Sequence, residues 1–192
     1  MGNVVPALFW FVPTAVGLAL IATSRAIANE ALYALAAGIA LGWAALNQVG
    51  FWDNARMRSE LLERLEAKDP VPLDHWFVGF ATNNFFGLLD AHEDVGFLVF
   101  EPNQLTFISE TRRLEIERRS VGEIRYRLNA HSVLGLGRWV SVEGHQAGVR
   151  IRLQVEPREH RTMLKNLLAS KALRQKLETW RIGTGAGHVN QP

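Results

Sequence analysis

The sequence predicts an α+β protein in which an N-terminal transmembrane helical hairpin precedes an antiparallel β-meander or barrel closed by a C-terminal α-helix. Three observations predict this class. The chain before Asp53 is almost free of charge, since it holds only Arg25 and Glu30. Short segments that alternate apolar and polar residues follow one another from Phe97 onward. After Pro157 the apolar residues take the spacing of a helix.

Residues 1–52 are expected to form a two-helix membrane anchor, with spans at about 4–22 and 31–52. Neither span holds a charged residue, and about 20 apolar residues in a helix cross roughly 30 Å of hydrocarbon. Gly38 and Gly42 form a G-x-x-x-G pattern in a stripe of small residues, which lets two helix backbones approach closely. We expect these glycines to pack the two helices together or, alternatively, to support self-association.

The distribution of positive charge predicts the orientation of the anchor. Arg25 is the only basic residue between the spans. The basic residues that follow the second span are Arg56, Arg58, Arg64 and Lys68. Because basic loops stay in the cytoplasm, the pattern indicates a multi-pass inner-membrane protein with both termini cytoplasmic.

Two other interpretations of the apolar segments compete with this one. Ala26-Ile27-Ala28 resembles a signal-peptide cleavage site, but the chain lacks a positive segment before the first apolar run. A helical hairpin buried in a soluble core is the second alternative. Two uncharged spans of this length favour the membrane anchor over both.

Residues 53–72 are expected to continue the second span as an amphipathic linker helix and to end in a proline-rich stop. Its apolar stripe consists of Met57, Leu61, Leu62 and Leu65. Asp69-Pro70-Val71-Pro72 ends the helix, because a residue before proline disfavours helical backbone. The stripe is expected to rest on its own domain or, alternatively, to mediate dimerisation or lipid contact.

Residues 73–182 are expected to form the soluble domain, and the glycine-rich residues 183–192 a disordered tail. The segment before Phe97 is dense in aromatic residues and is expected to add a strand and a turn. The alternating segments are GFLVFEP, QLTFIS, RRLEIER, EIRYRLN, RWVSVEG and GVRIRLQVEP. REHRTMLKNLLASKALRQKLETW then has helical spacing, with a break expected near Ser170.

The segments GFLVFEPNQLTFISETRRLEIERRSVGEI and GVRIRLQVEPREHRTMLKNLL resemble a bacterial pleckstrin-homology-like, or GRAM-like, domain over roughly Asp94 to Trp180. The resemblance implies a strand meander closed by a terminal helix, and a ligand-binding or scaffolding module rather than an enzyme. Phosphoinositide binders of this class carry basic residues in the first hairpin. FLVFEPNQLTFIS holds no Lys or Arg, which argues against that ligand.

The sequence contains no recognisable motif for catalysis or for cofactor binding. The chain has no cysteine, which excludes thiolate metal sites and disulfides. The densest metal-ligand types are Asp90, His92, Glu93 and Asp94. Neighbours in one turn rarely converge on an ion, and the histidines 131, 145 and 160 are scattered. The sequence therefore predicts no enzyme, no metal and no cofactor.

The arginines between residues 112 and 127 are interleaved with glutamates, which indicates a self-neutralising hairpin. A turn at Val121 would set Glu117 opposite Arg125 and Glu115 opposite Arg127. Such pairing argues against a continuous basic stripe of the kind that binds nucleic acid. The arginines that this register leaves as candidate contacts to an anionic surface are Arg112, Arg113, Arg118, Arg119, Arg150 and Arg152.

Taken with the anchor, these features predict a non-catalytic module that works beside the membrane. Its partners are expected to be the bilayer itself and either a protein or anionic lipid headgroups, since tethering makes weak contacts sufficient. The alternative is an oligomeric membrane scaffold that self-associates through the hairpin and the linker helix. An enzyme of unrecognised class is the least favoured reading.

Overall fold

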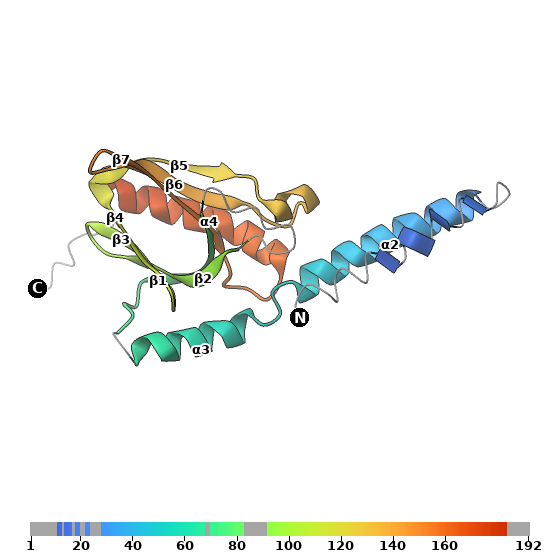
Figure 1. Cartoon of the computed structure of the whole chain (residues 1–192), viewed down its shortest axis with the longest axis horizontal. Helices are drawn as coiled ribbons and strands as arrows, with labels where there is room; N and C mark the ends of the chain where they lie inside the picture. Colours follow the sequence, from blue (N-terminus) through green and yellow to red (C-terminus); the bar gives the residue numbers. More distant parts are fainter. Residues whose placement is uncertain are drawn as a thin grey trace, which may run out of the picture.

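The computed structural model describes residues 11–12, 14–16, 18–19, 22–23, 28–67, 70–82 and 92–183. In this part the chain is α+β: a long N-terminal helix, a second shorter helix, an open antiparallel sheet and a C-terminal helix (Figure 1). The helices are α2 (Ala28–Val49), α3 (Asn54–Glu66) and α4 (Met163–Ile182). The expected disordered tail lies outside the described residues from 184 onward.

Seven strands form one sheet in the order β4-β3-β2-β1-β7-β6-β5, with all neighbours antiparallel. The strands are β1 (His75–Ala81), β2 (Asp94–Phe100), β3 (Gln104–Ile108), β4 (Arg113–Glu117), β5 (Val121–Arg127), β6 (Trp139–Gln146) and β7 (Val149–Pro157). Short 3₁₀ helices, η2 (Arg118–Ser120) and η3 (Ala130–Leu134), follow β4 and β5. The first and last strands pair in the middle of the sheet, which joins two meanders into one surface.

The main core lies between one face of the sheet and α4. Leu173 and Leu177 are fully buried against strand residues such as Val78. Full burial of an aliphatic side chain contributes about 1.5–3 kcal/mol, so these contacts fix α4 on the sheet. The helix runs unbroken past Ser170, contrary to the sequence-based expectation. The Ser170 hydroxyl is buried but donates to the Leu167 carbonyl and accepts from Arg138 Nε, which removes the reason for a break.

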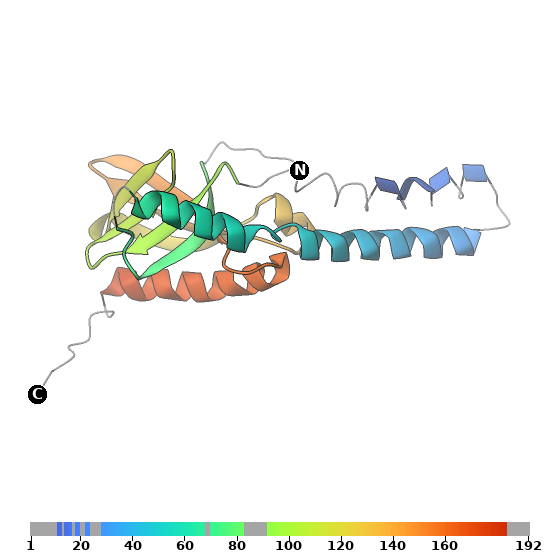
Figure 2. The same ribbon diagram turned by 90° about the horizontal axis from the view of Figure 1, so that it is seen from below.

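The apolar stripe of α3 packs on the opposite face of the sheet (Figure 2). Leu61 and Leu65 are buried against Phe77, Phe97 and Val99. Because neighbouring residues of a strand point to opposite faces, Phe77 meets α3 while Val78 meets α4. The expectation that this stripe rests on its own domain is confirmed, and the same contacts leave it little surface for a dimer or a lipid.

The sequence predicted that the linker helix would continue the second span. In the structure the two helices are separate. A turn over residues 50–53 separates α2 from α3. At Gly50 a β-carbon would lie 2.6 Å from the Met163 sulfur and 2.8 Å from the Leu46 carbonyl oxygen, so the chain is tightly packed where it leaves α2. Phe51 then turns inward and is 4% exposed. Burial of this ring is the physical reason for the break.

Helix α2 extends away from the sheet and exposes large apolar side chains, among them Leu32, Ile39 and Leu41 (Figure 1). In the described part of the chain, one stretch, Leu35–Glu66, which runs from α2 through the turn into α3, is by length and composition long and apolar enough to cross a membrane. Gly38 and Gly42 are buried. The nine described residues between 11 and 23 are helical and run beside α2 in both views; the rest of the first predicted span lies outside the described residues.

The predicted hairpin between RRLEIER and EIRYRLN is wrong. Strand β4 pairs with β3, which sets Glu115 opposite Thr106, and β5 pairs with β6, which sets Arg125 opposite Ser141. The two strands therefore occupy opposite ends of the strand order, connected by η2. Counting charges across two adjacent segments could not reveal that each had a better partner strand elsewhere.

Candidate functional site

A cluster of arginines surrounds one buried glutamate on the face of β5, β6 and β7 that points away from α4. We call it the Glu143 cluster; its members are Glu143, Arg125, Arg127, Arg150 and Arg152. Strand register brings them together, because Glu143 lies opposite Arg152 on β7 and beside β5. Positions two apart on a strand share a face, which places Arg125 with Arg127 and Arg150 with Arg152.

The carboxylate of Glu143 is saturated with hydrogen bonds, whereas the arginines around it keep N–H groups that do not bond to it. Its Oε1 accepts from Arg127 Nε at 2.6 Å and from Ser141 Oγ at 2.8 Å. Arg125 donates to both oxygens, at 3.1 and 2.9 Å. The longer contacts come from Arg150 Nη2 at 3.5 Å and Arg152 Nε at 3.4 Å. The buried Nε of Arg152 makes no hydrogen bond.

The cluster carries an excess of positive charge. Four guanidinium groups face Glu143, and Glu123 is a second acid, 3.6 Å from Arg125. The side chains of Arg125 and Arg150 are 40% and 62% exposed, so their remaining N–H groups can reach an incoming anion. Arginine favours carboxylates and phosphates, because its planar fork donates two parallel hydrogen bonds. The geometry therefore suits an anionic ligand.

Acid is expected to weaken the fold through Glu143. The Arg127 hydrogen bond, followed by those of Arg125 and Ser141, outweighs the cost of desolvation and holds the pKa of Glu143 far below its ordinary value of 4.5. A carboxylate with a depressed folded-state pKa adds stability above its unfolded pKa and loses it as the pH falls. We expect urea unfolding of the detergent-solubilised chain to show a steeper loss of stability from about pH 5 to about pH 3 than Glu143→Gln shows. Equal pH slopes for the two proteins would contradict this role.

The six arginines predicted as anionic-surface contacts do not gather into one patch. Arg150 and Arg152 belong to the Glu143 cluster. The arginines near β4 pair locally: Arg112 with Glu93, Arg113 with Glu115 at 2.8 Å, and Arg119 with Glu117 at 2.6 Å, while Arg118 lies in η2 beside Gly183. Strands β3, β2 and β1 separate β4 from β7. The sequence-based prediction did not count Arg125 and Arg127 among the anionic contacts, because it paired them with glutamates of β4, although their R-x-R spacing repeats that of Arg150 and Arg152.

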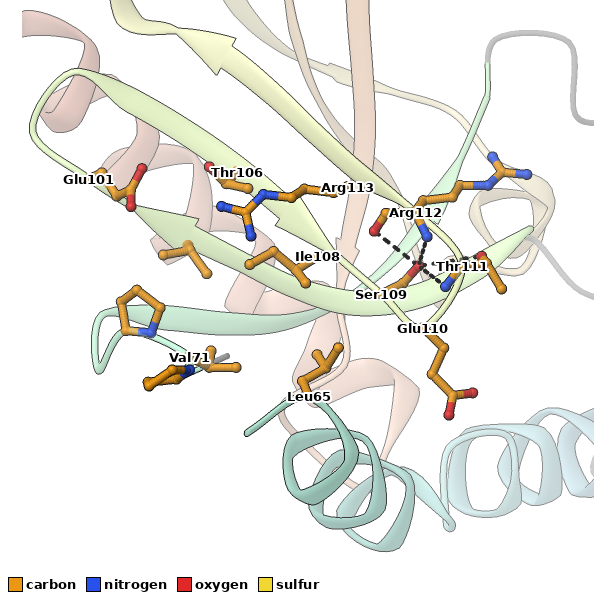
Figure 3. A pocket seen from close by; sticks show the side chains of 13 residues that line it. Leu65, Val71, Glu101, Thr106, Ile108, Ser109, Glu110, Thr111, Arg112 and Arg113 are labelled. Atoms are coloured by element: carbon orange, nitrogen blue, oxygen red, sulfur yellow. Dashed lines mark hydrogen bonds between the residues drawn. The ribbon is translucent and has the colours of Figure 1, made fainter. Parts of the chain in front are cut away.

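A pocket of about 430 Å³ lies between the end of α3, the proline segment and strands β2 to β4 (Figure 3). Its apolar wall is formed by Leu65, Val71, Val99 and Ile108. Arg112 and Arg113 are at its rim. The Ser109 hydroxyl donates to Asp94 and accepts from the Thr111 backbone, which orders the turn at the pocket's end.

A second polar group, which we call the histidine–glutamate cluster, consists of His92, His131 and Glu156. The side chain of Glu156 is completely buried, and its Oε2 lies 2.9 Å from His92 Nε2 and 3.3 Å from His131 Nδ1. Burial alone would raise the pKa of Glu156, but the hydrogen bonds of His131 and His92 outweigh it and lower the pKa to about 2. The sequence reading treated these histidines as scattered, because the three residues come from segments far apart in the chain.

The fold and these sites define an α+β protein in which a helix able to cross a membrane carries an open antiparallel sheet with a basic cluster on one face. No family model, no curated protein and no solved structure matches the chain.

Proposed function

We propose that this chain is a membrane-anchored, non-catalytic binding module of the pleckstrin-homology-like class, and that its Glu143 cluster holds an acidic, extended segment of a protein partner. The strand order, the antiparallel pairing and the closing helix α4 support the class. The single observation that carries the binding function is the convergence of four arginines on one saturated glutamate.

The anchor in this proposal is the two-span hairpin of an inner-membrane protein with both termini in the cytoplasm. The exposed apolar surface of α2 supports the second span, and the burial of Gly38 and Gly42 is consistent with close helix packing. The basic residues after α2 outnumber those before it, which favours a cytoplasmic domain.

The position of the cluster favours a protein over the lipid of the protein's own membrane. Glu143 lies near the end of β6 and Arg150 near the start of β7, beside the turn that joins them. Both views place this turn at the end of the domain remote from α2 (Figures 1 and 2). Electrostatic attraction to a lipid surface falls off within a Debye length, about 8 Å at physiological salt. In this proposal the cluster lies away from the bilayer that holds α2 and is open to a protein partner in the cytoplasm.

The spacing of the arginines matches an extended acidic segment. Side chains two residues apart on a strand are separated by about 7 Å. Arg125 and Arg127 have this spacing on β5, which ends the strand order, and Arg150 and Arg152 repeat it on β7. A segment with acidic residues at alternate positions would meet one arginine with each carboxylate. Opposite charges across such a contact also raise the rate of association at low salt.

Binding of a labelled polyglutamate peptide to the full chain in uncharged nanodiscs tests the proposal. We expect salt-sensitive binding that Arg125→Glu combined with Arg150→Glu weakens by about tenfold or more, since each exposed charge reversal replaces attraction by repulsion. Arg56→Glu combined with Arg119→Glu is the matched control, because both side chains are exposed and lie outside the cluster. Equal weakening by the control pair would overturn the proposal.

An oligomeric scaffold is the competing function, and the same nanodisc preparation tests it. The apolar stripe of α3 already packs on the sheet of its own chain. Self-association would therefore have to use the small residues Gly38 and Gly42 of α2. A defined multimer that Gly42→Leu dissociates, together with no peptide binding, would favour the scaffold.

A further inference from the structure

The proposed binding function does not use the histidine–glutamate cluster, whose three members come from separate elements of the fold. One nitrogen of each imidazole and one carboxylate oxygen of Glu156 lie within 4.8 Å of one another. His92 comes from the segment before β2, His131 from η3 and Glu156 from β7. Three separate elements therefore aim metal-ligand atoms at one point, under the turn that joins α2 to α3.

We propose that His92, His131 and Glu156 bind a divalent transition-metal ion such as Zn²⁺. Zinc binds imidazole nitrogen at about 2.0–2.1 Å and carboxylate oxygen at about 2.0–2.2 Å, so two ligands of a tetrahedral ion lie roughly 3.3 Å apart. The observed separations from Glu156 Oε2 are 2.9 Å to His92 Nε2 and 3.3 Å to His131 Nδ1. Small side-chain adjustments would admit the ion.

The partners around Glu156 suit a ligand held by an outer shell of hydrogen bonds. Its Oε1 accepts from the Arg138 backbone N–H at 3.1 Å, and Asn129 Nδ2 donates to Oε2 at 2.9 Å. Asn129 is itself fixed, because its side chain accepts from the Ser132 backbone at the start of η3. An ion would replace the two imidazole contacts and leave these bonds in place. Outer-shell bonds of this kind orient ligands in metal sites.

The backbone makes room for the cluster. A β-carbon on Gly79 would lie 1.9 Å from the His92 ring, and one on Gly137 would lie 2.2 Å from Glu156 Oε1. Only glycine fits at either position without moving the cluster.

A divalent ion would suit the charge of the cluster, since it would place positive charge against the buried Glu156 carboxylate. Three protein ligands would leave a fourth position for water. The side chain of His131 is 14% exposed and offers the route of entry.

The ion would tie the membrane helix to the domain. The Phe51 ring lies 5.8 Å from the His92 ring and 5.9 Å from the His131 ring, centroid to centroid. Fixing the two imidazoles therefore fixes the surface on which the α2–α3 turn packs. Loss of the ion is therefore expected to loosen this junction while the Glu143 cluster keeps its arginines.

Metal titration of the full chain, purified in detergent and stripped with a chelator, tests the proposal. We expect one Zn²⁺ per chain by calorimetry, and Co²⁺ is expected to bind at the same site with the ligand-field absorption of a tetrahedral ion. His131→Gln should weaken binding by about 100-fold or more, and Asn129→Ala by about 10–100-fold as an outer-shell change. His145→Gln, an exposed histidine on β6, is the control and should bind as the parent does.

Circular dichroism shows whether each variant folds. If His131→Gln does not fold, the metal affinity of Asn129→Ala decides the test. A folded parent chain that binds no stoichiometric metal would overturn the proposal, because the three residues would then form a hydrogen-bonded cluster alone. Binding that His145→Gln removes, or that neither Asn129→Ala nor a folded His131→Gln weakens, would overturn it equally.

Discussion

Replacing Phe51 with alanine is expected to lower the free energy of unfolding of the domain by about 3–5 kcal/mol, the usual cost of deleting a buried aromatic ring. The ring is 4% exposed and packs with Leu136 and Met163. It also carries the Arg158 guanidinium 4.6 Å above its centroid. Truncation would leave a cavity, expose the histidine–glutamate cluster and remove this cation–π contact.

Urea unfolding of the detergent-solubilised chain, followed by circular dichroism, measures the Phe51 effect. Trp52→Ala is the matched control, because the neighbouring ring is 57% exposed and should cost less than about 1 kcal/mol. A Phe51→Ala variant as stable as Trp52→Ala would show that the turn between α2 and α3 does not hold the domain.

The Phe51 effect matters because this ring lies where α2 meets the domain, beside two hydrogen bonds among the described residues. Trp43 Nε1 donates to the Leu134 carbonyl at 2.9 Å, and the Asn47 side chain accepts from the Leu164 backbone at 2.8 Å. Each hydrogen bond contributes about 0.5–1.5 kcal/mol. The buried ring therefore outweighs either of them in fixing how α2 leaves the sheet.

Replacing Glu156 with alanine is the second change with a large expected effect. The carboxylate accepts from His92, His131, Asn129 and the Arg138 backbone. Its removal leaves buried donors without an acceptor, each at a cost of about 1–3 kcal/mol. We expect the free energy of unfolding to fall by about 3 kcal/mol or more, a large part of the 5–15 kcal/mol typical of a domain.

The same urea experiment measures Glu156→Ala. Glu115→Ala is its control, because Glu115 is an exposed strand glutamate whose partner is a surface arginine, and such pairs contribute about 0–1 kcal/mol. A loss for Glu156→Ala that stays within the range of the control would mean that water replaces the carboxylate without cost, and that the cluster does not support the fold.

Much of the fold could be predicted because it depends on local periodicity. Alternation along QLTFIS and GVRIRLQVEP marks strands that the structure confirms as β3 and β7. The spacing of Leu61 and Leu65 predicted a stripe that packs on the domain, as it does. In each case the spacing of apolar residues within a short segment shows which face of the strand or helix is buried, so the segment alone predicts the element.

The candidate sites depend on pairing between distant segments and could not be predicted in this way. Arg125 meets Glu143, 18 positions away, only because β5 pairs with β6 rather than with β4. Glu156 looked like the polar residue of an alternating strand, yet its side chain is completely buried. The residues next to Glu156 in the sequence do not indicate its contact with His92, which lies 64 positions earlier in the chain.

The central claim is that the Glu143 cluster faces the cytoplasm and binds an acidic protein segment rather than headgroups. The chain has no cysteine, so Val149→Cys gives a unique labelling site beside the cluster, at a side chain that is 67% exposed. A fluorophore there is placed in nanodiscs that contain anionic lipid and a lipid-borne quencher, with Ile39→Cys on α2 as the membrane-embedded control.

We expect the label at position 149 to escape the lipid quencher and to respond to the polyglutamate peptide, while the label at position 39 is quenched and does not respond. Quenching at position 149 by the lipid-borne quencher, with no response to the peptide, would contradict binding of an acidic protein segment and assign the cluster to the membrane surface.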